Sequence, residues 1–65
     1  MMTLKQAREA KGVKQAAIAK YLGVSRQTYA SYESRQEEMS ISQAKAVCKY
    51  LGYPVEQIFF AEEVK

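Results

Sequence analysis

Glycine occurs at only three positions in this 65-residue sequence, 12, 23 and 52, and each glycine follows an amphipathic stretch. Glycine adopts the left-handed conformation that ends many helices at little steric cost. Within each stretch the apolar residues recur at helical spacing, so the glycines indicate helix ends. We therefore expect an all-α fold of five helices without strands.

The predicted helices are short, and several begin with a recognisable cap. Thr3 with Gln6, and Ser40 with Gln43, have the spacing of a capping box. Pro54 suits the first turn of a short last helix. The predicted helices cover residues 4–11, 15–22, 26–33, 41–51 and 55–60, with a polar loop over 34–39 and a short tail over 61–65.

The apolar residues of these helices supply the expected core. They are Leu4, Ala7, Val13, Ile18, Ala19, Leu22, Tyr29, Tyr32, Ile41, Ala44, Val47, Cys48, Leu51 and Phe59. We expect residues 1–65 to form one domain. Because a domain of this size buries only about 60% of the surface of its unfolded chain, a partner that covers further apolar surface would help it.

Charge is unevenly distributed along the chain. Residues 1–35 carry seven basic and two acidic side chains, a balance of +5, whereas residues 36–65 carry three basic and five acidic ones, a balance of −2. A basic half favours contact with a polyanion, although ordinary solvation of charged side chains explains it about equally well.

The composition argues against an enzyme. The sequence has no His, Asp, Asn or Trp and a single cysteine, Cys48, so nucleophile pairs and transition-metal sites cannot be assembled from the usual residues. Adjacent Glu37 and Glu38 are more simply a solvated charge pair than an acid/base pair. Nothing predicts a cofactor or a small-molecule ligand.

With no secretory signal and no apolar run of about 20 residues, we expect a cytoplasmic protein without membrane contact.

Residues 15–34 meet the demands of two short helices that cross through a tight turn. Ala19 places a small side chain at the crossing, and Gly23 permits a positive φ in the turn. Apolar side chains fill the angle between the helices, namely Ile18, Leu22, Val24, Tyr29 and Tyr32. The outer face of the second helix stays polar, with Arg26, Gln27, Thr28 and Ser31. This helix-turn-helix pattern favours DNA binding over a purely structural helix pair.

The run Gly23-Val24-Ser25-Arg26-Gln27-Thr28, followed by Tyr-x-x-Tyr-Glu, resembles the Cro/cI-type (Xre) helix-turn-helix repressors of phages and bacterial mobile elements. The resemblance extends from Leu4 to Phe59 and includes Leu-Gly-Tyr-Pro-Val-Glu-Gln-Ile-Phe near the end. It implies a compact five-helix, lambda-repressor-like domain, usually a two-fold dimer on a near-palindromic operator.

The resemblance also implies roles for individual residues. Base readout is expected from Arg26, Gln27 and Ser31, since arginine recognises guanine and glutamine recognises adenine in the major groove. Contacts to the DNA backbone or flanking bases are expected from Gln15, Ser25 and Thr28. At two further positions, Lys14 and Arg35, the sequence departs from the usual family pattern, and there the expected phosphate contact comes from the charge of the side chain. Bonding of Thr28 back to its own helix is an equal alternative. The acidic residues at 37 and 38 weaken the expectation for Arg35.

Two further sets of contacts are expected. Arg8 and Glu33 match a structural ion pair that ties the first helix to the end of the recognition helix. A homodimer is expected because one recognition helix reads few base pairs, with interface candidates in the last helix and the tail: Tyr53, Ile58, Phe60 and Val64. Packing of Phe60 under the tail of its own monomer is the alternative.

These features favour a sequence-specific regulator of transcription, most simply a repressor that binds double-stranded DNA near the bacterial nucleoid. An activator and the antitoxin of a toxin–antitoxin pair share the fold, although the tail is short for an antitoxin. A protein-interaction module that has lost DNA binding is the alternative from another class. The acidic loop favours that alternative, whereas Arg26, Gln27 and the basic half oppose it.

Overall fold

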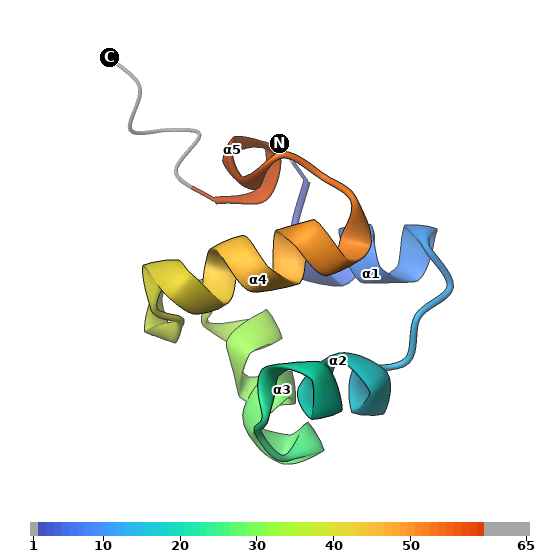
Figure 1. The fold of residues 1–65 in the computed structure, drawn as a ribbon, viewed down its shortest axis with the longest axis vertical. Helices are drawn as coiled ribbons and strands as arrows, with labels where there is room; N and C mark the ends of the chain where they lie inside the picture. The colour runs from blue at the N-terminus through green and yellow to red at the C-terminus, as the bar shows by residue number, and fades with distance from the viewer. Residues whose placement is uncertain (1, 60–65) are drawn as a thin grey trace.

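The computed structural model describes residues 2–59, which form five α-helices and one short 3₁₀ turn (Figure 1). In chain order these are α1 (Leu4–Ala10), α2 (Gln15–Leu22), α3 (Arg26–Ser34), the 3₁₀ turn η1 (Gln36–Glu38), α4 (Ile41–Leu51) and α5 (Val55–Ile58). Residues 2–59 contain no strand, so the expected all-α fold is confirmed. Within the same residues, no helix has the length and apolarity needed to cross a membrane.

Local signals set most of the helix ends. Both predicted capping boxes form, with the Thr3 and Ser40 hydroxyls accepting from the backbone N–H three residues later. The three glycines have φ values of 68°, 77° and 83°, the left-handed conformation expected at helix ends. The bounds of α2 and α4 match the prediction, whereas α1 ends one residue earlier and α3 one residue later. The loop expected over 34–39 contains η1.

The helices pack around one hydrophobic core. In Figure 1, α4 crosses the middle of the molecule between the α2–α3 pair and α5, and α4 contacts both α2 and α5. The buried residues are Leu4, Ala7, Ile18, Ala19, Tyr29, Ala44, Val47, Cys48, Leu51, Ile58 and Phe59. Partly buried side chains, among them Val13, Leu22, Val24 and Tyr32, pack against this cluster. The α2–α3 pair is thus held by apolar contacts on its inner side.

Ile41 does not belong to the core, contrary to the sequence prediction. Its side chain is 63% exposed. Ile41 is the first residue of α4 and lies at the edge of the buried stripe that Ala44 and Cys48 define. Met39, which precedes the helix cap, packs against the core in this region. A hydrophobic residue just before the cap commonly packs against the fourth helical residue, here Ala44.

Ile58 is also placed differently from the prediction, because α5 is shorter than expected. The helix ends at Ile58, and Phe59 takes an extended conformation with φ −118° and ψ 147°. This change of backbone conformation lets two consecutive apolar side chains face inward, so Ile58 is fully buried beside Phe59. Ile58 is therefore a core residue, and its assignment to a dimer interface was wrong.

The beginning and the end of the described chain lie side by side. The Met2 N–H donates to the Gln57 carbonyl at 3.1 Å. Gln36, in η1, accepts from the Leu4 N–H at 2.8 Å, and its amide donates to the Ile58 carbonyl at 3.5 Å. One glutamine side chain therefore links the segment after α3 to the start of α1 and the end of α5.

Candidate nucleic-acid interface

The turn between α2 and α3 is fixed by backbone hydrogen bonds. Gly23 has φ 77° and ψ 29°, its N–H donates to the Lys20 carbonyl at 3.1 Å, and the Val24 N–H donates to the Ala19 carbonyl at 3.0 Å. Apart from Gly23 and its two chain neighbours, no heavy atom of the described residues lies within 4 Å of where a Cβ on Gly23 would be. Glycine is favoured here by its positive φ rather than by crowding. Ser25 then caps α3, its Oγ accepting from the Thr28 N–H at 3.0 Å.

The inner sides of α2 and α3 lock the two helices together. Ile18 and Tyr29 are fully buried, and Ala19 is almost so. Leu22 and Tyr32 pack against the same cluster from its edge. A buried inner side means that the direction of α3 is set by the core, which leaves its outer side free to act on a partner.

The outer side of α3 is polar, with Gln27 and Thr28 exposed and Ser31 half-buried. Ser25, Gln27, Thr28 and Ser31 line a shallow depression on the surface. The Ser25 hydroxyl donates to Thr28 Oγ1 at 3.0 Å, and the Ser31 hydroxyl donates to the Gln27 carbonyl at 3.3 Å. The Gln27 side chain has no hydrogen-bond partner within residues 2–59 and is therefore available to an external one.

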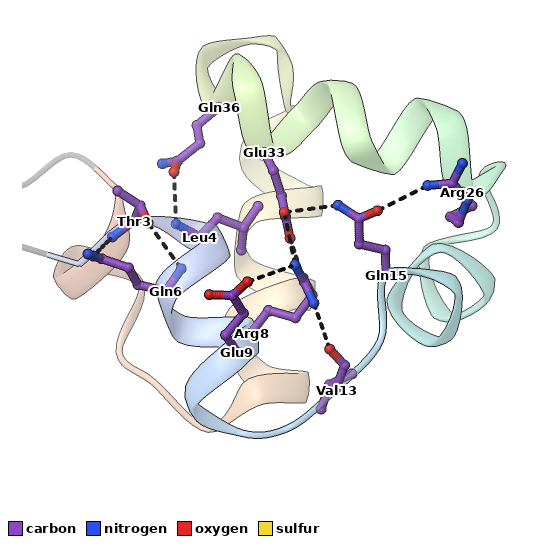
Figure 2. Close-up of polar contacts among 10 residues, drawn as sticks. All are labelled: Thr3, Leu4, Gln6, Arg8, Glu9, Val13, Gln15, Arg26, Glu33 and Gln36. Carbon is purple, nitrogen blue, oxygen red and sulfur yellow. Dashed lines mark hydrogen bonds and ion pairs between the residues drawn. The ribbon is translucent and has the colours of Figure 1, made fainter.

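Arg8 and Glu33 form an ion pair where α1 meets the end of α3 (Figure 2). Arg8 Nε donates to Glu33 Oε2 at 2.5 Å, and Nη2 donates to Oε1 at 3.3 Å. Arg8 Nη1 donates to the Val13 carbonyl at 2.9 Å. The two side chains are 11% and 6% exposed, so this pair lies almost entirely out of solvent.

The environment of Glu33 favours its charged form. Burial alone would raise the pKa of Glu33, but hydrogen bonds from Arg8 and Gln15 and the nearby Tyr29 hydroxyl hold this pKa below its usual value. Burial, together with the Glu33 carboxylate, raises the pKa of Tyr29. The Tyr29 hydroxyl is buried and has no hydrogen bond of ordinary geometry among the described residues. Glu33 is thus a buried carboxylate surrounded by donors.

Gln15, expected at the DNA backbone, is engaged within the protein. Its Nε2 donates to Glu33 Oε1 at 3.0 Å, and its Oε1 accepts from Arg26 Nη1 at 3.1 Å. Figure 2 shows the resulting chain of contacts from Arg8 through Glu33 and Gln15 to Arg26. Sequence reasoning paired Arg8 with Glu33 but missed the link to Arg26. The signal that could have indicated this link is that Gln15 and Arg26 are each the first residue of their helix.

The other expected cations differ in their surroundings. Lys14 is exposed at the start of α2 and makes no capping hydrogen bond with its side chain, so it is available to an anion. Arg35, which follows α3, pairs with Glu38 at 3.2 Å. The carboxylate of Glu38 therefore offsets the positive charge of Arg35. Arg35 is for this reason a weaker candidate for phosphate contact than Lys14.

Of the four expected dimer-interface residues, the structure describes Tyr53 and Ile58. Tyr53 is half-buried, with Lys11 Nζ 5.1 Å from its ring centroid. Phe60 and Val64 lie outside the described residues, and Ile58 is in the core. An exposed aromatic pair, Tyr21 and Tyr50 with ring centroids 4.7 Å apart, was not singled out from the sequence.

Residues 2–59 contain no cluster of three His, Cys, Asp or Glu side chains suited to a metal ion.

Two helices locked through a glycine turn, the second with a polar outer side, define a helix-turn-helix DNA-binding protein. A family model described as Helix-turn-helix matches residues 4–58, most of the chain. The protein belongs to the Cro/cI-type (Xre) helix-turn-helix family, which is a family of DNA-binding regulators. Comparison with curated proteins and with solved structures found no match.

Proposed function

We propose that the protein is a sequence-specific transcriptional regulator in which α3 lies in the major groove of double-stranded DNA. The observation that carries this proposal is the two-sided character of α3. Its inner side is fixed by the buried Tyr29, while Arg26 and Gln27 stand exposed on the outer side. A rigid helix with exposed arginine and glutamine has the chemistry to read guanine and adenine.

The proposed contacts divide into two groups. Arg26 and Gln27 read base edges, with Ser31 in a lesser role because its side chain is short and bonded to its own helix. The starts of α2 and α3 approach the DNA backbone, where Lys14, Ser25 and Thr28 contact phosphates. Helix N-termini suit phosphates because their free N–H groups and dipole favour anions.

We further propose that the protein acts as a homodimer and represses transcription. Two-fold pairing doubles the bases read and matches half-sites about 34 Å apart on a near-palindromic operator. Tyr53, Phe60 and Val64 remain the interface candidates. Repression follows where the operator overlaps a promoter, and such a regulator works in the cytoplasm at the nucleoid.

Selection of bound sequences from a random duplex pool, near physiological salt, tests this proposal. We expect a near-palindrome whose half-sites lie about one helical turn apart. The Arg26→Ala, Gln27→Ala double variant is the matched control, because both side chains are exposed and their loss should leave the fold intact. Wild-type protein that enriches no sequence, and binds only weakly and in a salt-sensitive way, would contradict the proposal.

A protein-interaction module is the second candidate. The pairing of Arg35 with Glu38, and the adjacent Glu37, make the segment after α3 less attractive to a polyanion. Absence of sequence enrichment in the selection would favour this candidate over the regulator.

A further inference from the structure

Two hydroxyl groups on the outer side of α3, those of Thr28 and Ser31, line the same shallow depression. Both side chains are expected to meet DNA, but their hydrogen bonds within the protein differ. A serine or threonine hydroxyl has one O–H to donate and two lone pairs that accept. What each hydroxyl still offers to DNA therefore depends on the bonds that it already makes within the protein.

The single O–H of Ser31 is already bonded inside the protein. It donates to the Gln27 carbonyl at 3.3 Å, and the direction of this bond is certain because a carbonyl oxygen only accepts. The half-buried Ser31 Oγ therefore offers its lone pairs to a group that enters the depression. To donate to DNA instead, the hydroxyl would have to give up its bond to Gln27. The group that meets Ser31 should accordingly be a donor.

Thr28 has the opposite polarity. Its Oγ1 accepts from the Ser25 hydroxyl at 3.0 Å, and within residues 2–59 its own O–H is donated to no other group. Thr28 therefore presents a donor where Ser31 presents an acceptor. A phosphate oxygen of the DNA backbone only accepts, so it suits Thr28 and does not suit Ser31. The partner that remains for Ser31 is a base edge that carries a donor.

We propose that Ser31 accepts a hydrogen bond from the exocyclic amino group of a base. The protein then prefers an amino base, cytosine or adenine, over a keto base, guanine or thymine, on the strand that Ser31 faces. In the major groove cytosine N4 and adenine N6 donate, whereas guanine O6 and thymine O4 accept, so a keto base would place two acceptors against each other. This proposal rests on the proposed sequence-specific DNA binding and names the class of base read at one position.

The test uses the full chain and the operator that the selection yields, with each base pair replaced in turn by the other three. The base pair that Ser31 reads is the one at which Ser31→Ala changes the preference. There the wild type should favour the amino base about fivefold, and Ser31→Ala should favour it less than about twofold. Ser42→Ala, which removes the hydroxyl of an exposed serine on α4, is the matched control and should alter no preference.

A second measurement removes the amino group from the DNA. Purine in place of adenine, or pyrimidinone in place of cytosine, should weaken binding by wild type about fivefold more than binding by Ser31→Ala.

Four results would overturn the proposal: a keto base preferred at the Ser31 position, no base pair at which Ser31→Ala changes the preference, a uniform loss over all sequences in Ser31→Ala, or equal losses with the analogue in the two proteins. Each of these leaves the proposed function intact, because an operator has been selected. Wild-type protein that selects no operator would overturn the proposed function, and this proposal with it.

Discussion

Arg8 on α1 and Glu33 on α3, 25 positions apart in the sequence, are joined by two hydrogen bonds of 2.5 and 3.3 Å. The third contact of the Arg8 guanidinium, to the Val13 carbonyl, fixes the segment that leads into α2. One arginine therefore connects α1, the entry to α2 and the end of α3. The orientation of the recognition helix α3 depends on this pair as well as on the core.

Replacing Arg8 with leucine should strongly destabilise the fold. Glu33, only 6% exposed, would remain in place as an almost buried carboxylate without its cation. We expect the free energy of unfolding, measured with urea, to fall by about 3 kcal/mol. Arg35→Leu is the control, because its exposed pair with Glu38 should contribute less than about 1 kcal/mol. Equal losses in the two variants would contradict a structural role for Arg8.

Stability should fall in acid through Glu33. Its pKa is lower in the folded protein than in the unfolded chain, so the unfolded state takes up the proton first as the pH falls. The contribution of Glu33 is complete above the unfolded pKa and is lost as the pH falls from about 4.5 through the lower folded pKa. Unfolding free energies measured across this range should decline less steeply in Glu33→Gln. Parallel curves would show that other carboxylates cause the decline.

Gly23→Ala should cost about 1 kcal/mol of stability, because an alanine at φ 77° is strained although its Cβ meets no atom within 4 Å. Asparagine tolerates the left-handed conformation better, so Gly23→Asn should cost less. Thermal unfolding of the two variants checks this order. A larger loss in Gly23→Asn would indicate that the turn selects against side-chain size rather than against the backbone strain of alanine.

Gln27→Ala should reduce binding by about 1–3 kcal/mol at one base pair of each half-site and relax the sequence preference there. The measurement is competition between the operator and singly substituted operators. If affinity falls by the same factor for every sequence, Gln27 contacts phosphate and the base-reading role is wrong.

Binding should weaken steeply with salt, because phosphate contacts release counterions. Lys14→Gln should reduce the slope of log K against log salt by about 1 for each monomer. Lys45→Gln, on α4 outside the proposed interface, is the matched control and should leave the slope unchanged. A slope that is the same in Lys14→Gln and wild type would remove Lys14 from the phosphate contacts.

The sequence by itself determined where the five helices of residues 2–59 begin and where α2 and α4 end. Thr3, Ser25 and Ser40 cap helices through backbone N–H groups three residues away, and Gly23 and Gly52 end helices through their own φ. These interactions span only a few residues, so their spacing is visible without the fold. The helix-turn-helix was predictable for the same reason, since its small, flexible and apolar positions lie within 20 consecutive residues.

The tertiary structure alone decided where the core departs from the helical pattern and which distant polar groups meet. Ile41 is exposed because it lies at the edge of its stripe, and Ile58 is buried because α5 ends early. The contacts of Gln15 with Glu33 and Arg26 join three separate positions of the chain. Such contacts depend on how the helices pack in space. Helical periodicity determines which side chains share a face, but only packing determines what that face meets.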